Sequence, residues 1–195
     1  SNETGAVIAA PECDTDLLSD ATQALGKVPI DLGPIKYASC SAHKIYGPKG
    51  VGALYARYAE FPDPLVRGGG QENGHRSGTL NVPAIVGFGA ACALATDRMV
   101  EDHAHAMAMR SVVIEELASV SDWTTNDGPA QSPFVLSLTI VGIVGESLVV
   151  ELDREGFAIG AGPACSAHSR AVSPTLKALG WTDQQAQGTV RISFG

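Results

Sequence analysis

The segment Ser39-Cys-Ser-Ala-His-Lys44-Ile-Tyr-Gly-Pro-Lys-Gly50 joins two short runs of apolar and small residues. The run before it, Ile35 to Ser41, predicts a short buried strand that ends at a polar cluster. The run after it, Gly50 to Ala56, predicts a second strand. Ligands bind beyond the ends of strands in an open α/β sheet, so this polar cluster is a candidate site.

Strands and helices alternate on both sides of this segment. Leu17-Leu18 leads into Ser19-Asp20, which predicts that another strand ends near Asp20. Apolar spacing, the candidate cap Ser147, the opening of a helix at Ser173-Pro174, and other Gly or Pro positions predict the remaining elements. They are strands over 134–140, 157–159 and 189–194, helices over 81–99, 101–119, 145–155 and 173–180, and polar connections over 62–78 and 123–131. The alternation predicts an α/β fold with one domain over 1–100 and another over 101–195.

The composition excludes several classes of protein. A length of 195 residues with 45% hydrophobic and 17% charged residues is typical of a globular chain with a real core. A net charge of -8 argues against a nucleic-acid surface, which needs clustered Lys and Arg. No uninterrupted apolar run approaches the roughly 20 residues that span a bilayer, and the start shows no secretion signal, so we expect no membrane partner.

The cysteines stand at positions 13, 40, 92 and 165, and none forms a CxxC pair. This spacing does not predict a metal site, and the length and composition do not suggest a disulfide framework. Reduced thiols and a cytoplasmic location are therefore expected.

Each candidate residue of the polar cluster has an ordinary structural explanation by itself. Lys44 could be a surface charge, Asp20 a turn or cap residue, and His43 a core histidine. Asp20 and Lys44 nevertheless both follow predicted strands, Gln23 comes three residues after Asp20, and Ser41 and His43 precede Lys44. Spacing alone does not name a cofactor.

Four motifs in collinear order resemble the cysteine desulfurases of the class V aminotransferase family, especially the group that supplies sulfur for iron–sulfur clusters. The motifs are Asp20-Ala-Thr-Gln23, Ser41 to Tyr55, Gly68-Gly-Gly-Gln-Glu72 and Arg76-Ser-Gly-Thr79. The resemblance implies the fold-type I architecture of pyridoxal-phosphate (PLP) enzymes. That architecture has a large domain with a mixed, mostly parallel sheet, a smaller α/β domain, and a homodimer.

The resemblance also implies roles for these residues. Lys44 resembles the lysine that binds PLP as an imine, and Asp20 the carboxylate that holds the pyridine nitrogen protonated. The remaining cofactor contacts would come from Gln23 at the ring oxygen, Ser41, Ala42 and His43 at the phosphate, Thr79 at the partner subunit's phosphate, and Asn2 of an Asn-Glu-x-Gly motif beside the cofactor and the substrate carboxylate. His43 could in addition act as an acid or base.

Two further residues would decide which reaction PLP performs. Cys165 lies in a loop of small residues, Gly160 to His168, which resembles the family's active-cysteine loop. An accessible thiolate there could take sulfur from L-cysteine, with His168 and Arg170 favouring the thiolate. Cys165 could instead be a small buried hydrophobe. Arg191 resembles the arginine that binds the substrate carboxylate through paired N–H bonds, and otherwise would be a surface charge.

The resemblance implies that the chain is a fragment, because family members carry a long segment before the Asn-Glu-x-Gly motif and helices after the position of Arg191. The leading expectation is a cysteine desulfurase that passes sulfur to a scaffold or carrier protein. The alternatives are a selenocysteine lyase, an aminotransferase of the same family, and a non-catalytic module that dimerises or relays sulfur.

Overall fold

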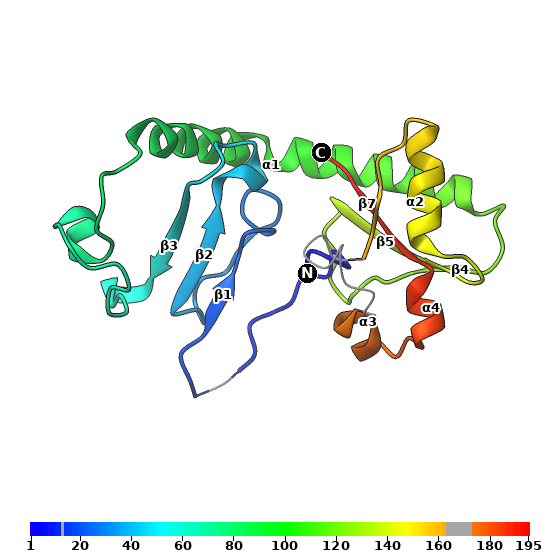
Figure 1. The fold of residues 1–195 in the computed structure, drawn as a ribbon, viewed down its shortest axis with the longest axis horizontal. Helices are drawn as coiled ribbons and strands as arrows, with labels where there is room; N and C mark the ends of the chain where they lie inside the picture. The colour runs from blue at the N-terminus through cyan, green and yellow to red at the C-terminus, as the bar shows by residue number, and fades with distance from the viewer. Residues whose placement is uncertain (13, 163–172) are drawn as a thin grey trace. The chain divides into compact units, whose positions relative to one another are not determined.

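The chain divides into two compact units in the computed structural model, which describes residues 1–12, 14–162 and 173–195 (Figure 1). One unit is Ala9–Met99, and the other combines Ser1–Ile8 with Val100–Gly195. The first residues of the chain therefore belong with its second half. The assignment of the units to a large and a small domain stays a prediction.

The unit Ala9–Met99 is built on a three-stranded mixed sheet in the order β1-β2-β3 (Figure 1). Its strands are β1 (Leu18–Asp20), β2 (Tyr37–Ser41) and β3 (Gly52–Ala56). β1 and β2 run parallel, with Asp20 opposite Ser39, and β2 and β3 run antiparallel. The strands predicted on either side of Lys44 are therefore confirmed, and they are neighbours in the sheet.

Short 3-10 helices connect this sheet to the rest of the unit. They are η1 (Ala42–Ile45), η2 (Arg57–Ala59) and η3 (Gln71–Gly74). η1 follows β2 directly and turns its apolar side inward, because Ala42 and Ile45 form a buried cluster with Phe88 and Ala91. This packing fixes the backbone of the segment that carries Lys44.

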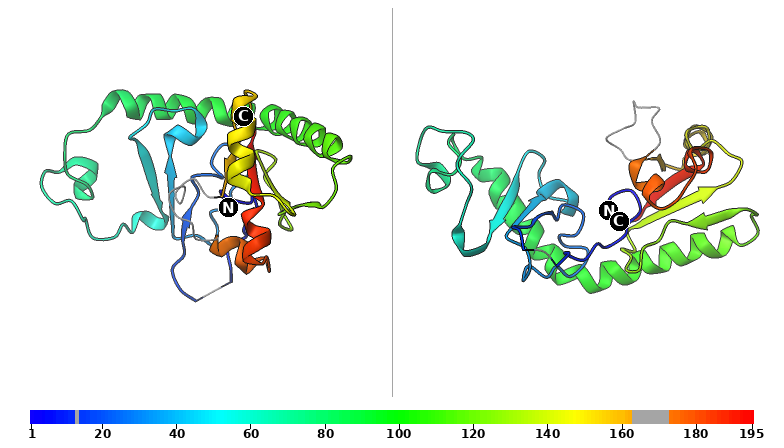
Figure 2. Two further views of the ribbon diagram at one scale, coloured as in Figure 1. Left: turned by 45° about the vertical axis from the view of Figure 1, so that its right-hand side comes forward. Right: turned by 90° about the horizontal axis from the view of Figure 1, so that it is seen from below.

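A single helix, α1 (Val82–Leu117), replaces the two helices predicted on either side of residue 100. The predicted break is wrong because residues 98–102 contain no glycine or proline, so nothing interrupts the backbone hydrogen bonds. The right-hand view of Figure 2 shows α1 as one unbroken helix. Asn81 caps its start, since the side-chain oxygen of Asn81 accepts from the backbone N–H of Ala84 at 3.3 Å.

By length and composition alone, α1 is long and apolar enough to cross a membrane, although one such helix is weak evidence for a span. The sequence contains no uninterrupted apolar run long enough to span a bilayer, but that observation did not exclude a long helix such as α1, in which polar residues interrupt the apolar ones. Large apolar side chains remain exposed along the helix at Val82, Ile85, Val86, Leu94, Val100, Met107, Met109 and Val112.

The unit Ser1–Ile8 with Val100–Gly195 contains a four-stranded antiparallel sheet in the order β4-β5-β7-β6. Its strands and helices are β4 (Trp123–Thr125), β5 (Val135–Ile140), α2 (Gly145–Arg154), β6 (Gly160–Ala161), α3 (Pro174–Ala178), α4 (Asp183–Gln187) and β7 (Thr189–Ser193). Leu136, Leu138 and Val190 form its core, against which Val113 and Ile114 of α1 pack.

Several local predictions for this unit need correction. The polar connection over 123–131 contains β4, and the strand expected over 157–159 lies instead at Gly160–Ala161. Ser147 does not cap α2, since the capping residue is Val144. The predicted start of a helix at Ser173-Pro174 is confirmed by α3. The structure shows in addition that Ser173 caps it, because its hydroxyl accepts from Thr175 N at 3.1 Å and Leu176 N at 3.3 Å.

Buried polar groups also join the elements of this unit. Arg110 of α1 donates from Nη2 to both carboxylate oxygens of Asp127 at 2.6 Å, and its side chain is only 9% exposed. The amide of Asn126, which follows β4, donates to Thr139 of β5 at 3.0 Å, and the hydroxyls of Thr139 and of Thr189 in β7 lie 2.7 Å apart. Trp181 donates to the Asn126 oxygen at 2.7 Å. These bonds satisfy polar atoms that would be costly to bury alone.

Candidate functional site

The ends of β1 and β2 lie at the same edge of the mixed sheet, because the two strands are parallel neighbours. Asp20 is the last residue of β1, and Ser41 is the last residue of β2 and the first before η1. This edge therefore brings together the two motifs that the sequence places 24 residues apart, at Asp20 and Lys44. It is the kind of edge at which open α/β sheets bind ligands.

Asp20 is an exposed carboxylate held in its charged form. Its Oδ1 accepts from the backbone N–H of Thr22 at 3.0 Å. Hydrogen bonds from Thr22, with a smaller contribution from Ser39, lower the pKa of Asp20 below its ordinary value. The edge thus carries a fixed negative charge at neutral pH.

The residues next to Lys44 differ in how far they are exposed to solvent. His43 is exposed and Lys44 half-buried, whereas Ala42 is completely buried. The backbone N–H of Ala42 donates to Val51 O at 3.1 Å, so this N–H is already engaged and cannot also bind a phosphate in this arrangement. The side chain of Ser41 makes no capping bond to η1, which leaves its hydroxyl for other partners.

Gln23 and Lys27 lie on the turn that follows β1. The Lys27 ammonium donates to the side-chain oxygen of Gln23 at 3.4 Å. Burial, and then the like charge of Lys44, lower the pKa of Lys27 below its ordinary value. Gln23, Lys27 and Lys44 therefore form one group, which we call the lysine cluster. The sequence analysis did not single out Lys27, although its position four residues after Gln23 was the available signal.

Thr79 stands apart from the contacts of the lysine cluster. It is exposed in the segment between η3 and α1. Its predicted role, contact with a phosphate bound by a partner subunit, stays a prediction.

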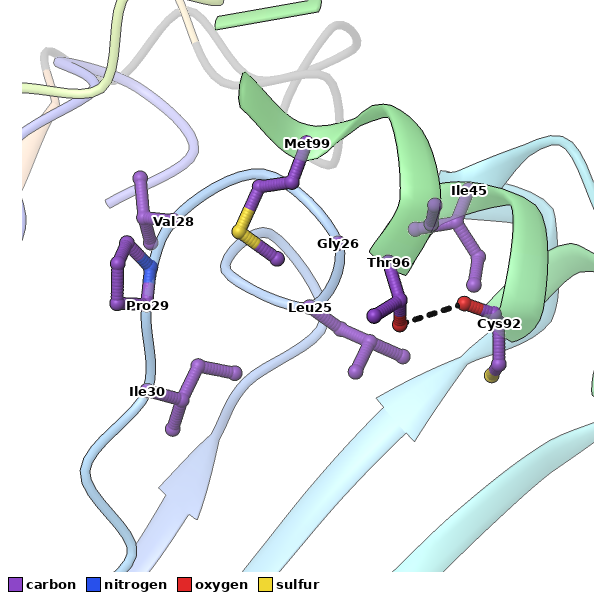
Figure 3. A pocket seen from close by; sticks show the side chains of 10 residues that line it. Leu25, Gly26, Val28, Pro29, Ile30, Ile45, Cys92, Thr96 and Met99 are labelled. Carbon is purple, nitrogen blue, oxygen red and sulfur yellow. Dashed lines mark hydrogen bonds between the residues drawn. The ribbon is translucent and has the colours of Figure 1, made fainter. Parts of the chain in front are cut away.

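An apolar pocket of about 210 Å³ lies against the turn that follows β1 (Figure 3). Leu25 and Val28 of the turn face Cys92, Thr96 and other residues of α1 across it. No charged side chain lines this pocket, so it does not suit a phosphate or a carboxylate. Burial, with a smaller contribution from Cys40, raises the pKa of the Cys92 thiol, which keeps that thiol protonated and weakly reactive.

A second group of predicted residues meets in the other unit. Arg191 of β7 donates from Nη1 to the backbone oxygen of Asn2 at 3.2 Å and to its side-chain oxygen at 3.4 Å. Within the described part of the chain, Nε of Arg191 is buried and has no hydrogen-bond partner. A buried donor of this kind is costly unless another group satisfies it, and a carboxylate would do so.

Cys165 lies outside the described residues, as do His168 and Arg170. The described chain resumes at Ser173, whose hydroxyl donates to Oε2 of the buried Glu3 at 2.7 Å. This bond ties the start of α3 to the Asn-Glu-x-Gly motif at the N-terminus.

The whole sequence, residues 1–195, matches the family described as Aminotransferase class-V. The chain belongs to the class V aminotransferase family. Enzymes of this family and the related cysteine desulfurases depend on PLP. The mixed sheet with flanking helices is consistent with the expected fold-type I architecture.

Individual relatives of this class V chain carry the name cysteine desulfurase. The mitochondrial cysteine desulfurase of Arthroderma benhamiae is 39% identical over 91% of this chain, and the cysteine desulfurase of Sinorhizobium fredii is 41% identical over 90%. A solved structure of a NifS-like protein superposes with a TM-score of 0.81 at 35% identity over 93% of the chain. The chain spans 36%, 46% and 47% of these three proteins, which is less than half of each.

Proposed function

We propose that the chain forms part of a PLP-dependent cysteine desulfurase, which converts L-cysteine to L-alanine and leaves the sulfur as a persulfide on Cys165. The observation that carries the proposal is the alignment of nine-tenths of the chain with relatives named cysteine desulfurase. The arrangement at the sheet edge and around Arg191 supports it, since each group has chemistry that the reaction needs.

The residues at the sheet edge suit PLP. An ionised Asp20 would keep the pyridine nitrogen protonated, and the hydroxyl of Ser41 has no capping role that would compete with a phosphate. Gln23 would contact the ring oxygen. When bound, PLP withdraws electrons from the α-carbon of an amino acid. Ala42 would contribute packing rather than a backbone donor, because its N–H is bonded to Val51.

Lys44 would bind the cofactor and, once its amine is free, carry the α-proton of the substrate. A neutral amine can accept a proton, and Lys44 lies half-buried in the lysine cluster. His43 is adjacent and exposed, so it would serve as an additional acid or base.

Arg191 would bind the substrate carboxylate. Its Nη1 is held by Asn2, and its buried Nε lacks a partner among the described residues, so a carboxylate would complete its hydrogen bonds. Asn2 thereby fixes the plane of the guanidinium and selects which of its N–H groups face the ligand.

Replacement of Arg191 by lysine is expected to raise the KM for L-cysteine by about 10- to 100-fold, the effect of one charge-assisted hydrogen bond. Lysine keeps the charge but not the planar fork. Steady-state kinetics on the PLP-bound protein would measure this change. Exchange of the exposed Arg154 for lysine is the matched control. A KM that Arg191→Lys leaves unchanged would rule out the carboxylate contact.

Cys165 would act as the nucleophile. Its thiolate attacks the sulfur of the substrate, the new S–S bond forms as the C–S bond breaks, and the electron pair of the C–S bond stays with the carbon, which is then protonated to give alanine. The persulfide would next pass to an iron–sulfur scaffold or a carrier protein.

Mass spectrometry after incubation with PLP and L-cysteine tests this function. Alanine should be released, and the peptide that contains Cys165 should gain the mass of one sulfur atom. Cys165→Ser should lose both products. If Cys165→Ser releases alanine at the original rate without added thiol, the desulfurase function is wrong and another class V reaction is favoured.

We further propose that the protein acts as a homodimer in the cytoplasm. The exposed apolar side chains along α1 support a protein partner on that helix, because water-exposed apolar surface favours association. The absence of a CxxC pair and of a disulfide pattern supports a reducing compartment.

A further inference from the structure

The turn that carries Gln23 and Lys27 has the hydrogen bonds of a short helix. Leu25 N donates to Ala21 O at 2.9 Å, and Val28 N donates to Ala24 O at 3.1 Å. The hydrogen bond between their side chains places Gln23 and Lys27 on the same side of the turn. Leu25 and Val28 instead line the apolar pocket of Figure 3. The turn thus separates an apolar side from a polar one.

Gly26 holds this turn against η1. Its φ of +69° lies in the left-handed region, and a Cβ there would stand 2.9 Å from Cγ2 of Ile45 and 2.8 Å from Cβ of Ala95. Only glycine allows so close an approach. Lys44 directly precedes Ile45, and Lys27 directly follows Gly26. The close contact between Gly26 and Ile45 therefore brings the two lysines near enough for the charge of Lys44 to lower the pKa of Lys27.

The hydrogen bond between Lys27 and Gln23 can have only one polarity. A lysine ammonium carries donors and no acceptor, whereas a glutamine amide carries an oxygen that accepts and an NH₂ group that donates. The Gln23 oxygen must therefore face Lys27, and its NH₂ group must point away from the ammonium. This orientation follows from chemistry and does not depend on how the amide atoms are assigned.

We propose that Lys27 is a positioning residue that turns Gln23 into a hydrogen-bond donor toward an anionic oxygen at the sheet edge. The inference rests on the proposed function, in which that oxygen is the ring oxygen of PLP. The opposite orientation of the amide would present its oxygen to such a ligand and repel it. The bond to Lys27 disfavours that orientation before the ligand binds.

The position of Lys27 is unfavourable for folding alone. Burial disfavours its charge, and Lys44 adds a like charge beside it. A methionine of similar length would avoid both costs. If Lys27 had a purely structural role, the Lys27→Met variant would be less stable than the original protein. If Lys27 is a positioning residue, the variant should bind the ligand more weakly and be as stable as the original protein or more stable.

The first test uses the protein without cofactor. The side-chain NH₂ resonances of Gln23, assigned by a Gln23→Ala variant, should be shifted from those of an exposed glutamine in the original protein and in Lys27→Arg, which keeps a donor. Lys27→Met should move them away from their positions in the original protein. Resonances that Lys27→Met leaves unchanged would overturn the proposal.

The second test measures PLP affinity and thermal unfolding in the same variants. Lys27→Met should weaken PLP binding about 3- to 10-fold, the effect of one ordinary hydrogen bond, without a lower unfolding temperature. Lys27→Arg should restore the affinity. In a Gln23→Ala background, Lys27→Met should have no further effect, because the two residues act through one interaction.

The outcomes separate this inference from the proposed function. An unfolding temperature that falls together with the affinity, or additive losses in the double variant, would make Lys27 a structural residue. If Lys44→Ala leaves PLP binding and its absorbance intact, the proposed cofactor role of Lys44 is wrong. The Gln23 resonances would still decide whether Lys27 orients the amide, since they need no cofactor.

Discussion

Lys44→Ala is expected to abolish the imine absorbance of the PLP-bound protein and to lower the proposed desulfurase activity by more than about 10³-fold. The absorbance requires an imine between the cofactor and an amine, and the catalytic effect follows because a positioned acid or base alone contributes about 10²- to 10⁴-fold. Absorption spectra of the protein with added PLP, followed by alanine release from L-cysteine, would measure both changes.

Lys177→Ala provides the control for this experiment. Lys177 is half-exposed on α3 and pairs with Asp183 at 3.0 Å, so its loss removes a lysine without touching the lysine cluster. An absorbance band that survives in Lys44→Ala would mean that PLP forms its imine elsewhere. Borohydride reduction and peptide mass analysis would then identify the modified lysine.

Asp127→Ala is expected to lower the free energy of unfolding by about 3 kcal/mol, the low end of the effect of breaking a buried ion pair. The substitution leaves the guanidinium of Arg110, which is 9% exposed, without its carboxylate. The low end applies because Asp127 itself is 33% exposed. Denaturant unfolding followed by circular dichroism would give the difference.

Glu151→Ala is the matched control, because it removes a carboxylate from an arginine pair on the surface. Glu151 and Arg154 are 67% and 68% exposed, and pairs of this kind contribute about 0.3–0.5 kcal/mol. Equal losses in Asp127→Ala and Glu151→Ala would show that burial adds nothing to the pair of Arg110 and Asp127.

The sequence predicts best where local pattern and local structure coincide. The strands on either side of Lys44 and the start of a helix at Ser173-Pro174 were predicted correctly, because apolar runs and helix-start residues act over a few positions. β4 was missed because Trp123-Thr-Thr125 has no pattern of its own and gains its partner only from β5. The break in α1 was predicted wrongly because a change of domain was taken for the end of a helix.

The residues of the candidate site were also predictable only where local sequence determines them, and not where contacts between distant residues do. Nothing in the spacing of Asn2 and Arg191 predicts that they meet across 189 positions, and only the family resemblance placed both at the substrate. Lys27 was overlooked because its significance depends on two contacts, with Gln23 and Lys44, that exist only in the folded turn. Cys165 remains a sequence prediction, since it lies outside the described residues.

The hydrogen-bonded threonines Thr139 of β5 and Thr189 of β7 matter for protein engineering. Thr139 lies opposite Thr189, and Ser137 opposite Arg191, so all four share one face of the sheet. A slip of one residue between β5 and β7 would carry Arg191 to the opposite face, away from Asn2. Valine at both threonine positions would suit a strand equally well but would erase the marker that distinguishes the correct alignment. Such a redesign could fold well and yet move Arg191 away from Asn2, a fault that a stability screen would not detect.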